Sequence, residues 1–111
     1  MKRAAEKIAE LERLIALIEE KKAAVPALVD HGTDWDAASA ARDKWHRAYN
    51  DILLHLAEKE GAKTGSSPFA GHALRLAGVQ STCTYGAHGL LSNWQLAAHR
   101  RIAKLMEGGG A

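Results

Sequence analysis

The amino-acid sequence predicts an all-α fold: a long antiparallel helical hairpin with a short third helix and a long fourth helix packed on it, like a four-helix bundle. Apolar residues recur at three- and four-residue spacing over long segments, as on one face of an α-helix. We expect no strands, because no alternation of apolar and polar residues stands out. The 111 residues are 47% hydrophobic and 25% charged, which suits one helical domain over residues 1–107 with a modest core.

The first helix is expected over residues 2–25. Pro26 lacks the backbone N–H that a helix needs and ends the segment, and Gly32 closes the connection to the next helix. The apolar face of this helix consists of Ile8, Leu11, Leu14, Ile15 and Ile18. Leu17 lies about 120° around the helix from Leu11 and widens this face, so a second subunit could cover part of it. A homodimer and a monomer are equally open.

The second helix is expected over residues 34–60. Thr33 and Asp36 form a capping signal at its start, and Gly61 ends it. The short polar link to the first helix favours an antiparallel hairpin. The apolar seam, at nearly unbroken three-four spacing, comprises Ala38, Ala41, Trp45, Ala48, Tyr49, Ile52 and Leu56.

A third helix is expected over residues 68–77, because Ser67 before Pro68 is typical of a helix start and Gly78 of a helix end. The fourth helix is expected over residues 82–106, followed by a disordered tail, 108–111. Its seam comprises Ala87, Leu91, Trp94, Ala98, Ile102 and Leu105. Arg101 lies on the same face, with its stem over the core, or in a buried ion pair, or in contact with a partner.

Charge is unevenly distributed along the chain. Residues 1–60 hold ten Lys and Arg against twelve Asp and Glu, whereas residues 61–111 hold five against one. No acidic residue lies between Glu60 and Glu107. The basic half could therefore bind an acidic protein surface or a nucleic acid, or simply dock on the acidic half of its own chain.

Few residues suggest chemistry. Cys83 is the single cysteine, which excludes an internal disulfide and fits the cytoplasm. The N-terminus has no apolar signal segment, and no stretch is apolar enough to cross a membrane. Cys83 near His88, or Asp51 near His55, could suggest catalysis or a metal, but packed and solvated side chains explain both pairs. We expect no enzymatic activity, no metal and no cofactor.

Residues 72–89, HALRLAGVQSTCTYGAHG, resemble a helix-turn-helix DNA-binding motif. Ala73, Ala77, Gly78 and Val79 match its first helix and turn. The resemblance, over residues 73–89, implies a dimeric transcriptional regulator that contacts DNA through Ser81, Thr82, Thr84, Tyr85 and His88. Alternatively, the stretch is only a corner between two helices, in which small residues allow close backbone approach.

The alanine-rich chain, ending in LLSNWQLAAHRRIAKL, resembles the small helical accessory and regulatory proteins of bacteriophages and prophages. This resemblance implies a non-enzymatic module that binds a host protein and inhibits or redirects it, as anti-CRISPR-type inhibitors do. A basic patch with an aromatic anchor suits an acidic partner surface. The expected partner-binding residues are Arg75, Tyr85, His88, Arg100, Arg101 and Lys104.

Overall fold

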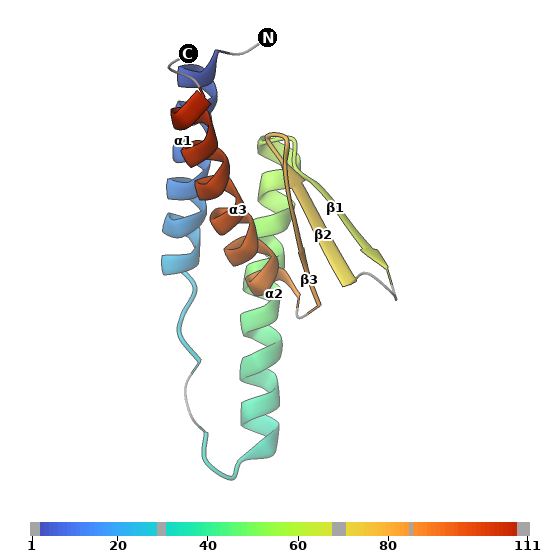
Figure 1. The fold of residues 1–111 in the computed structure, drawn as a ribbon. Helices are drawn as coiled ribbons and strands as arrows, with labels where there is room; N and C mark the ends of the chain where they lie inside the picture. The colour runs from blue at the N-terminus through green and yellow to red at the C-terminus, as the bar shows by residue number, and fades with distance from the viewer. Residues whose placement is uncertain (1–2, 29–30, 68–70, 85, 109–111) are drawn as a thin grey trace.

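Three helices and a three-stranded antiparallel sheet make up the computed structural model, which describes residues 3–28, 31–67, 71–84 and 86–108. In chain order the elements are α1 (Ala4–Ala23), α2 (Trp35–Lys59), β1 (Lys63–Ser67), β2 (Gly71–Leu76), β3 (Val79–Cys83) and α3 (Ala87–Gly108) (Figure 1). The fold is therefore mixed α and β, and the expected all-α bundle is wrong. The strand β2 and the turn after it replace the expected third helix over residues 71–77, and residues 68–70 lie outside the described residues. The fourth helix was expected from residue 82, but β3 extends to Cys83 and α3 begins at Ala87.

The helices α1 and α2 form close to their predicted bounds. α1 ends at Ala23, ahead of Pro26, and α2 begins after Asp34, whose carboxylate accepts a hydrogen bond from the Ala37 N–H at 3.0 Å. Asp34 is therefore the N-cap, rather than Thr33. At the other end of the chain, α3 includes Gly108, which was expected in the tail, and residues 109–111 lie outside the described residues.

The sheet has the strand order β1-β2-β3, so that β1 forms one edge. Leu74 and Leu76 of β2 and Val79 of β3 are buried on the inner face, whereas Arg75 and Gln80, which pair across the strands, are exposed on the outer face. This alternation comes from the sequence itself, since every second residue of a strand points to the same side. The pattern was missed because the helix was predicted from Ser67 before Pro68 as a start and Gly78 as an end, and the alternation is only a few residues long.

A tight turn at Ala77 and Gly78 joins β2 to β3. Both residues have positive φ angles, 53° and 76°, which match the two-residue turn that suits the twist of a β-hairpin. Gly78, expected to end a helix, instead supplies the conformation that this turn requires. Leu76 pairs with Val79 directly across it.

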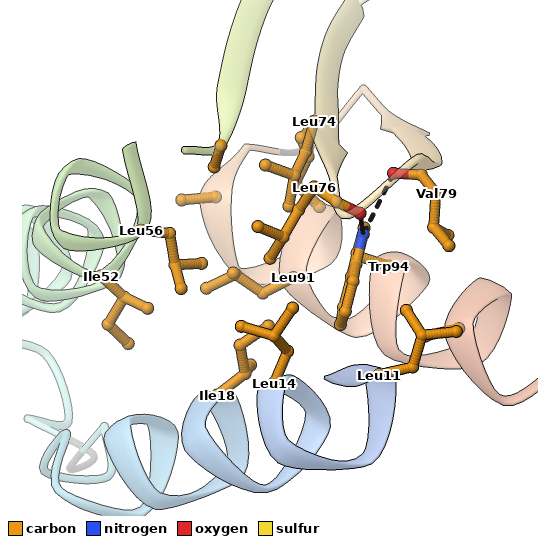
Figure 2. Packing of buried hydrophobic residues seen from close by; sticks show 14 of the residues in the cluster. Leu11, Leu14, Ile18, Ile52, Leu56, Leu74, Leu76, Val79, Leu91 and Trp94 are labelled. Carbon is orange, nitrogen blue, oxygen red and sulfur yellow. Dashed lines mark hydrogen bonds between the residues drawn. The ribbon is translucent and has the colours of Figure 1, made fainter. Parts of the chain in front are cut away.

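Trp94 of α3 lies at the centre of the core, and its side chain is fully buried (Figure 2). Its Nε1 donates hydrogen bonds to the carbonyl oxygens of Leu76, at 3.2 Å, and Val79, at 3.1 Å. The indole therefore fixes α3 against the β2–β3 turn. It belongs to one cluster of buried apolar side chains from all three helices and the inner face of the sheet, which includes Leu11, Leu14, Ile18, Ile52, Leu56, Leu74, Leu76, Val79 and Leu91.

Polar contacts fix the position of α3 more closely. The buried Ser81 hydroxyl donates to the Leu90 carbonyl at 3.0 Å, and Asn93 Nδ2 donates to the Thr82 carbonyl at 2.8 Å. Among the described residues, every buried side-chain nitrogen or oxygen has a hydrogen-bond partner. The small core is thus closed without the cost of an unsatisfied polar group.

The expected close hairpin of the first two helices does not form. α1 packs mainly along α3, and α3 crosses from α1 to α2 (Figure 1). The first part of α2 extends beyond the other elements, and Trp35 at its start is 78% exposed. The molecule measures 59 × 30 × 24 Å, and its radius of gyration of 16.2 Å exceeds the value of about 13 Å for a compact chain of this length.

Replacement of Trp94 tests the central contact. We expect Trp94→Phe to lower the free energy of unfolding by about 1–3 kcal/mol, because two buried carbonyls lose their indole donor. Trp94→Ala should cost about 3–5 kcal/mol. Urea denaturation followed by far-UV circular dichroism measures both changes, and a Trp94→Phe variant as stable as the parent would contradict the proposed role of the N–H group.

A glycine in the sheet provides a second test. Gly71 has a φ of 74°, and a Cβ added to it would lie 2.9 Å from the Cys83 carbonyl oxygen. We expect Gly71→Ala to destabilise the protein by about 1–3 kcal/mol. Gly65→Ala is the matched control, because a Cβ there meets nothing within 4 Å. Equal thermal unfolding midpoints for the two variants would show that the conformation of Gly71 is not constrained.

Candidate interaction surfaces

Three cations lie together on the C-terminal half of α3. Arg100, Arg101 and Lys104 are all exposed, whereas Ala98 and Ile102 are buried. Arg101 was expected with its stem over the core and its head in water, or in a buried ion pair or a partner contact, and its exposure excludes the buried ion pair. We call Arg100, Arg101 and Lys104 the α3 basic surface.

The acidic half of the chain does not neutralise this surface. The ion pairs between described residues all lie within the first 60 positions: Lys7–Glu10 at 3.2 Å, Arg13–Glu60 at 2.7 Å and Lys22–Glu19 at 3.6 Å. Arg13 lowers the pKa of Glu60 through its hydrogen bond, so that this pair is internally satisfied. The simpler explanation of the charge asymmetry was that the basic half of the chain docks on the acidic half. No ion pair between described residues joins the α3 basic surface to the acidic half.

Arg75 does not join the α3 basic surface. It is exposed on the outer face of β2, and Lys63 of β1 lies opposite it in the register. α3 packs on the inner face of the sheet, against Leu74 and Leu76. The sheet thus separates Arg75 from the α3 cations, and the expected single patch becomes two.

His88 lies in an aromatic cluster rather than beside the cations. Its ring centroid is 5.1 Å from that of Trp45 and 4.8 Å from that of Tyr49. Burial and the positive charge of Lys22 lower the pKa of His88, and burial and Glu19 raise the pKa of Tyr49. Along α3 the cluster is about 18 Å from Arg100. Tyr85, expected as an aromatic anchor, lies outside the described residues.

The residues expected to read DNA do not form a recognition helix. Ser81 and Thr82 belong to β3, and Thr84 follows the strand. Ser81 is buried, and Thr82 and Thr84 are exposed. The two helices that the motif needs over residues 73–89 are replaced by a β-hairpin and the first turn of α3. The helix-turn-helix interpretation is therefore wrong for this segment, because its small residues serve a hairpin turn and strand pairing.

An apolar groove of about 270 Å³ lies between the α1–α2 connection and the first part of α2. Ala41, Trp45 and Ala48 of the predicted α2 seam form one side of the groove, and none of them is fully buried. Leu28 beside it is 47% exposed. The sequence carried a signal for this exposure, since the seam there uses alanine where the buried part uses Ile and Leu. The lining residues are Pro26, Ala27, Leu28, His31, Ala41, Lys44, Trp45 and Ala48.

Other kinds of site receive no support from the described residues. They contain no group of three His, Cys, Asp or Glu side chains that could hold a metal ion, and Cys83 is half-buried at the end of β3. None of their helices has the length and apolar character needed to cross a membrane. Comparison with models of protein families, with curated proteins and with solved structures found no match to the chain.

The aromatic cluster predicts a pH dependence. Because the pKa of His88 is lowered in the folded protein from 6.5, the unfolded chain binds the proton more tightly, and stability should fall as the pH drops through about 6.5. NMR titration of the imidazole measures this pKa directly. Lys22→Met should raise it, and Lys21→Met, at the neighbouring position, should not. A His88 pKa that does not respond to Lys22 would contradict the assigned cause.

Proposed function

We propose that this protein is a non-enzymatic, cytoplasmic protein-binding module whose α3 basic surface docks on an acidic surface of its partner. The observation that carries the proposal is the exposure of Arg100, Arg101 and Lys104 on one helix, with no carboxylate of the described residues paired to them. Because one helix holds the backbone of all three cations in fixed relative positions, they give an interface a defined direction.

An apolar contact accompanies these cations. Leu96 is 55% exposed and lies one helical turn before Arg100, so that the two side chains are neighbours on the α3 surface. Charged side chains mainly raise the rate of association and the specificity, whereas a buried apolar side chain supplies affinity. Leu96 thus takes the anchoring role that the sequence analysis gave to Tyr85 and His88.

A protein partner fits this surface better than a nucleic acid. α1 lies along α3 and carries the exposed carboxylates of Glu6, Glu12 and Glu20. A phosphate backbone following α3 would meet repulsion from these groups, whereas a compact acidic patch can contact the three cations alone. Occupation of the partner's acidic patch blocks its other ligands, which agrees with the inhibitory role implied by the resemblance to phage accessory proteins.

Charge reversal tests the proposal. Tagged protein is incubated with nuclease-treated bacterial lysate, and bound proteins are quantified by mass spectrometry. We expect the triple variant Arg100→Glu, Arg101→Glu and Lys104→Glu to lose the specific partner by about tenfold or more, because attraction becomes repulsion. Lys63→Glu with Arg75→Glu is the matched control, since these cations lie on the outer face of the sheet.

Circular dichroism should show that both variants keep the parent helix content. Capture that is equal for the parent and the triple variant, or no specific capture by the parent, would refute the proposal. A gel shift with mixed-sequence DNA that weakens steeply with salt would assign the surface to nucleic acid instead.

A further inference from the structure

The first part of α2 is an amphipathic helix whose apolar face is covered by the described chain at Trp45 but exposed at Trp35. Trp35, Ala38, Arg42 and Trp45 follow one another at spacings of three and four residues and so lie on one side of the helix. Trp35 is 78% exposed, and Trp45 is half-buried against Tyr49 and His88. We call Trp35, Ala38, Arg42 and Trp45 the α2 face. An exposed face of this kind marks a site of association.

We propose that the α2 face binds the same face of a second copy of this chain, with the two α2 helices antiparallel about a two-fold axis near residue 40. The order of side chains along the face supports this arrangement. Trp35 and Trp45 stand equally far from residue 40, so the rotation places each Trp35 on the Trp45 of the other copy. Ala38 near the axis lets the helices approach closely, and the stem of Arg42 covers it.

Charge complementarity specifies the antiparallel direction. Two charged residues lie on or beside the α2 face: Asp34 at the start of the helix and Arg42 two turns later. Antiparallel pairing brings Asp34 of each copy towards Arg42 of the other. In particular, Arg42 opposite Ala38 can reach Asp34, which is one helical turn away. Parallel pairing would place Arg42 of each copy beside Arg42 of the other.

The area that the α2 face can bury suits a weak, reversible dimer. A well-buried aromatic side chain contributes roughly 150–250 Å². Trp35 is exposed and can supply most of this area, whereas Trp45 is already half-buried and supplies less. A standard stable interface buries about 800 Å² per partner. The apolar groove beside the α2 face, with Leu28 and Ala41 in its lining, makes up part of the difference. We therefore expect a dissociation constant in the micromolar range, on the order of 1–100 µM.

Sedimentation of the purified chain tests the proposal without any other partner, so its outcome is independent of the α3 basic surface. The apparent mass should rise from 12.0 kDa towards twice that value as the concentration increases through the micromolar range. Trp35→Ala should weaken the dimer by about tenfold or more, because the anchor is lost. Leu54→Ala is the matched control, since Leu54 is 58% exposed on the opposite side of α2 and should leave the constant unchanged.

A second set of variants tests the direction of pairing. Arg42→Glu should weaken the dimer, because the new carboxylate opposes Asp34 of the other copy. Adding Asp34→Asn, which preserves the helix cap, should recover part of the loss by removing that repulsion. A chain that remains monomeric at millimolar concentration, or a dimer indifferent to Trp35→Ala, would overturn the proposal. The proposal would also be overturned if the chain stays monomeric and the Trp35→Ala variant no longer captures a protein from lysate. That result would show that the α2 face binds a different protein.

Discussion

The indole N–H of Trp94, shared between the carbonyl oxygens of Leu76 and Val79, joins the helical and sheet parts of the molecule. A three-stranded sheet with short strands needs a packed apolar face to be stable, and α3 provides that face. Because Trp94 binds both sides of the β2–β3 turn, it brings α3 into contact with the sheet and also fixes the position of α3 along it. The exposure of Arg100, Arg101 and Lys104 follows from this position, since the inward side of the helix is already committed to the core.

A second set of polar contacts decides which helices pair. The buried Gln95 donates from Nε2 to the Ile15 carbonyl at 3.3 Å and accepts from Lys22 Nζ at 2.9 Å. These bonds hold α1 on α3, so α1 does not cover the first part of α2. Trp45 is therefore only half-buried: its ring contacts Tyr49 and His88, and it also lines the apolar groove. One fold constraint thus accounts for both the elongated shape and the partly uncovered α2 face.

The helices were predictable from local pattern, but the sheet was not. α1 and α2 follow uninterrupted three-four spacing and end near Pro26 and Gly61, whereas β2 and β3 are too short for periodicity to exclude a helix. Ala77–Gly78 suits a helix end or a tight turn equally, and only the pairing of Leu76 with Val79 decides between them. The sequence identified the α3 cations as candidates, but it could not separate them from Arg75 and His88, because that separation depends on the sheet.

The strand β1 has a neighbour on one side only, so part of its backbone N–H and C=O groups remain available to another extended chain. Its residues, KTGSS, combine a cation, a glycine and small hydroxyl side chains, a composition with little tendency to stack into ordered fibrils. An edge strand of this composition can remain unpaired without favouring aggregation through further strand pairing. Lys63 and Thr64 of this edge strand are exposed, and the more apolar β2 lies between β1 and β3, where both of its edges are paired.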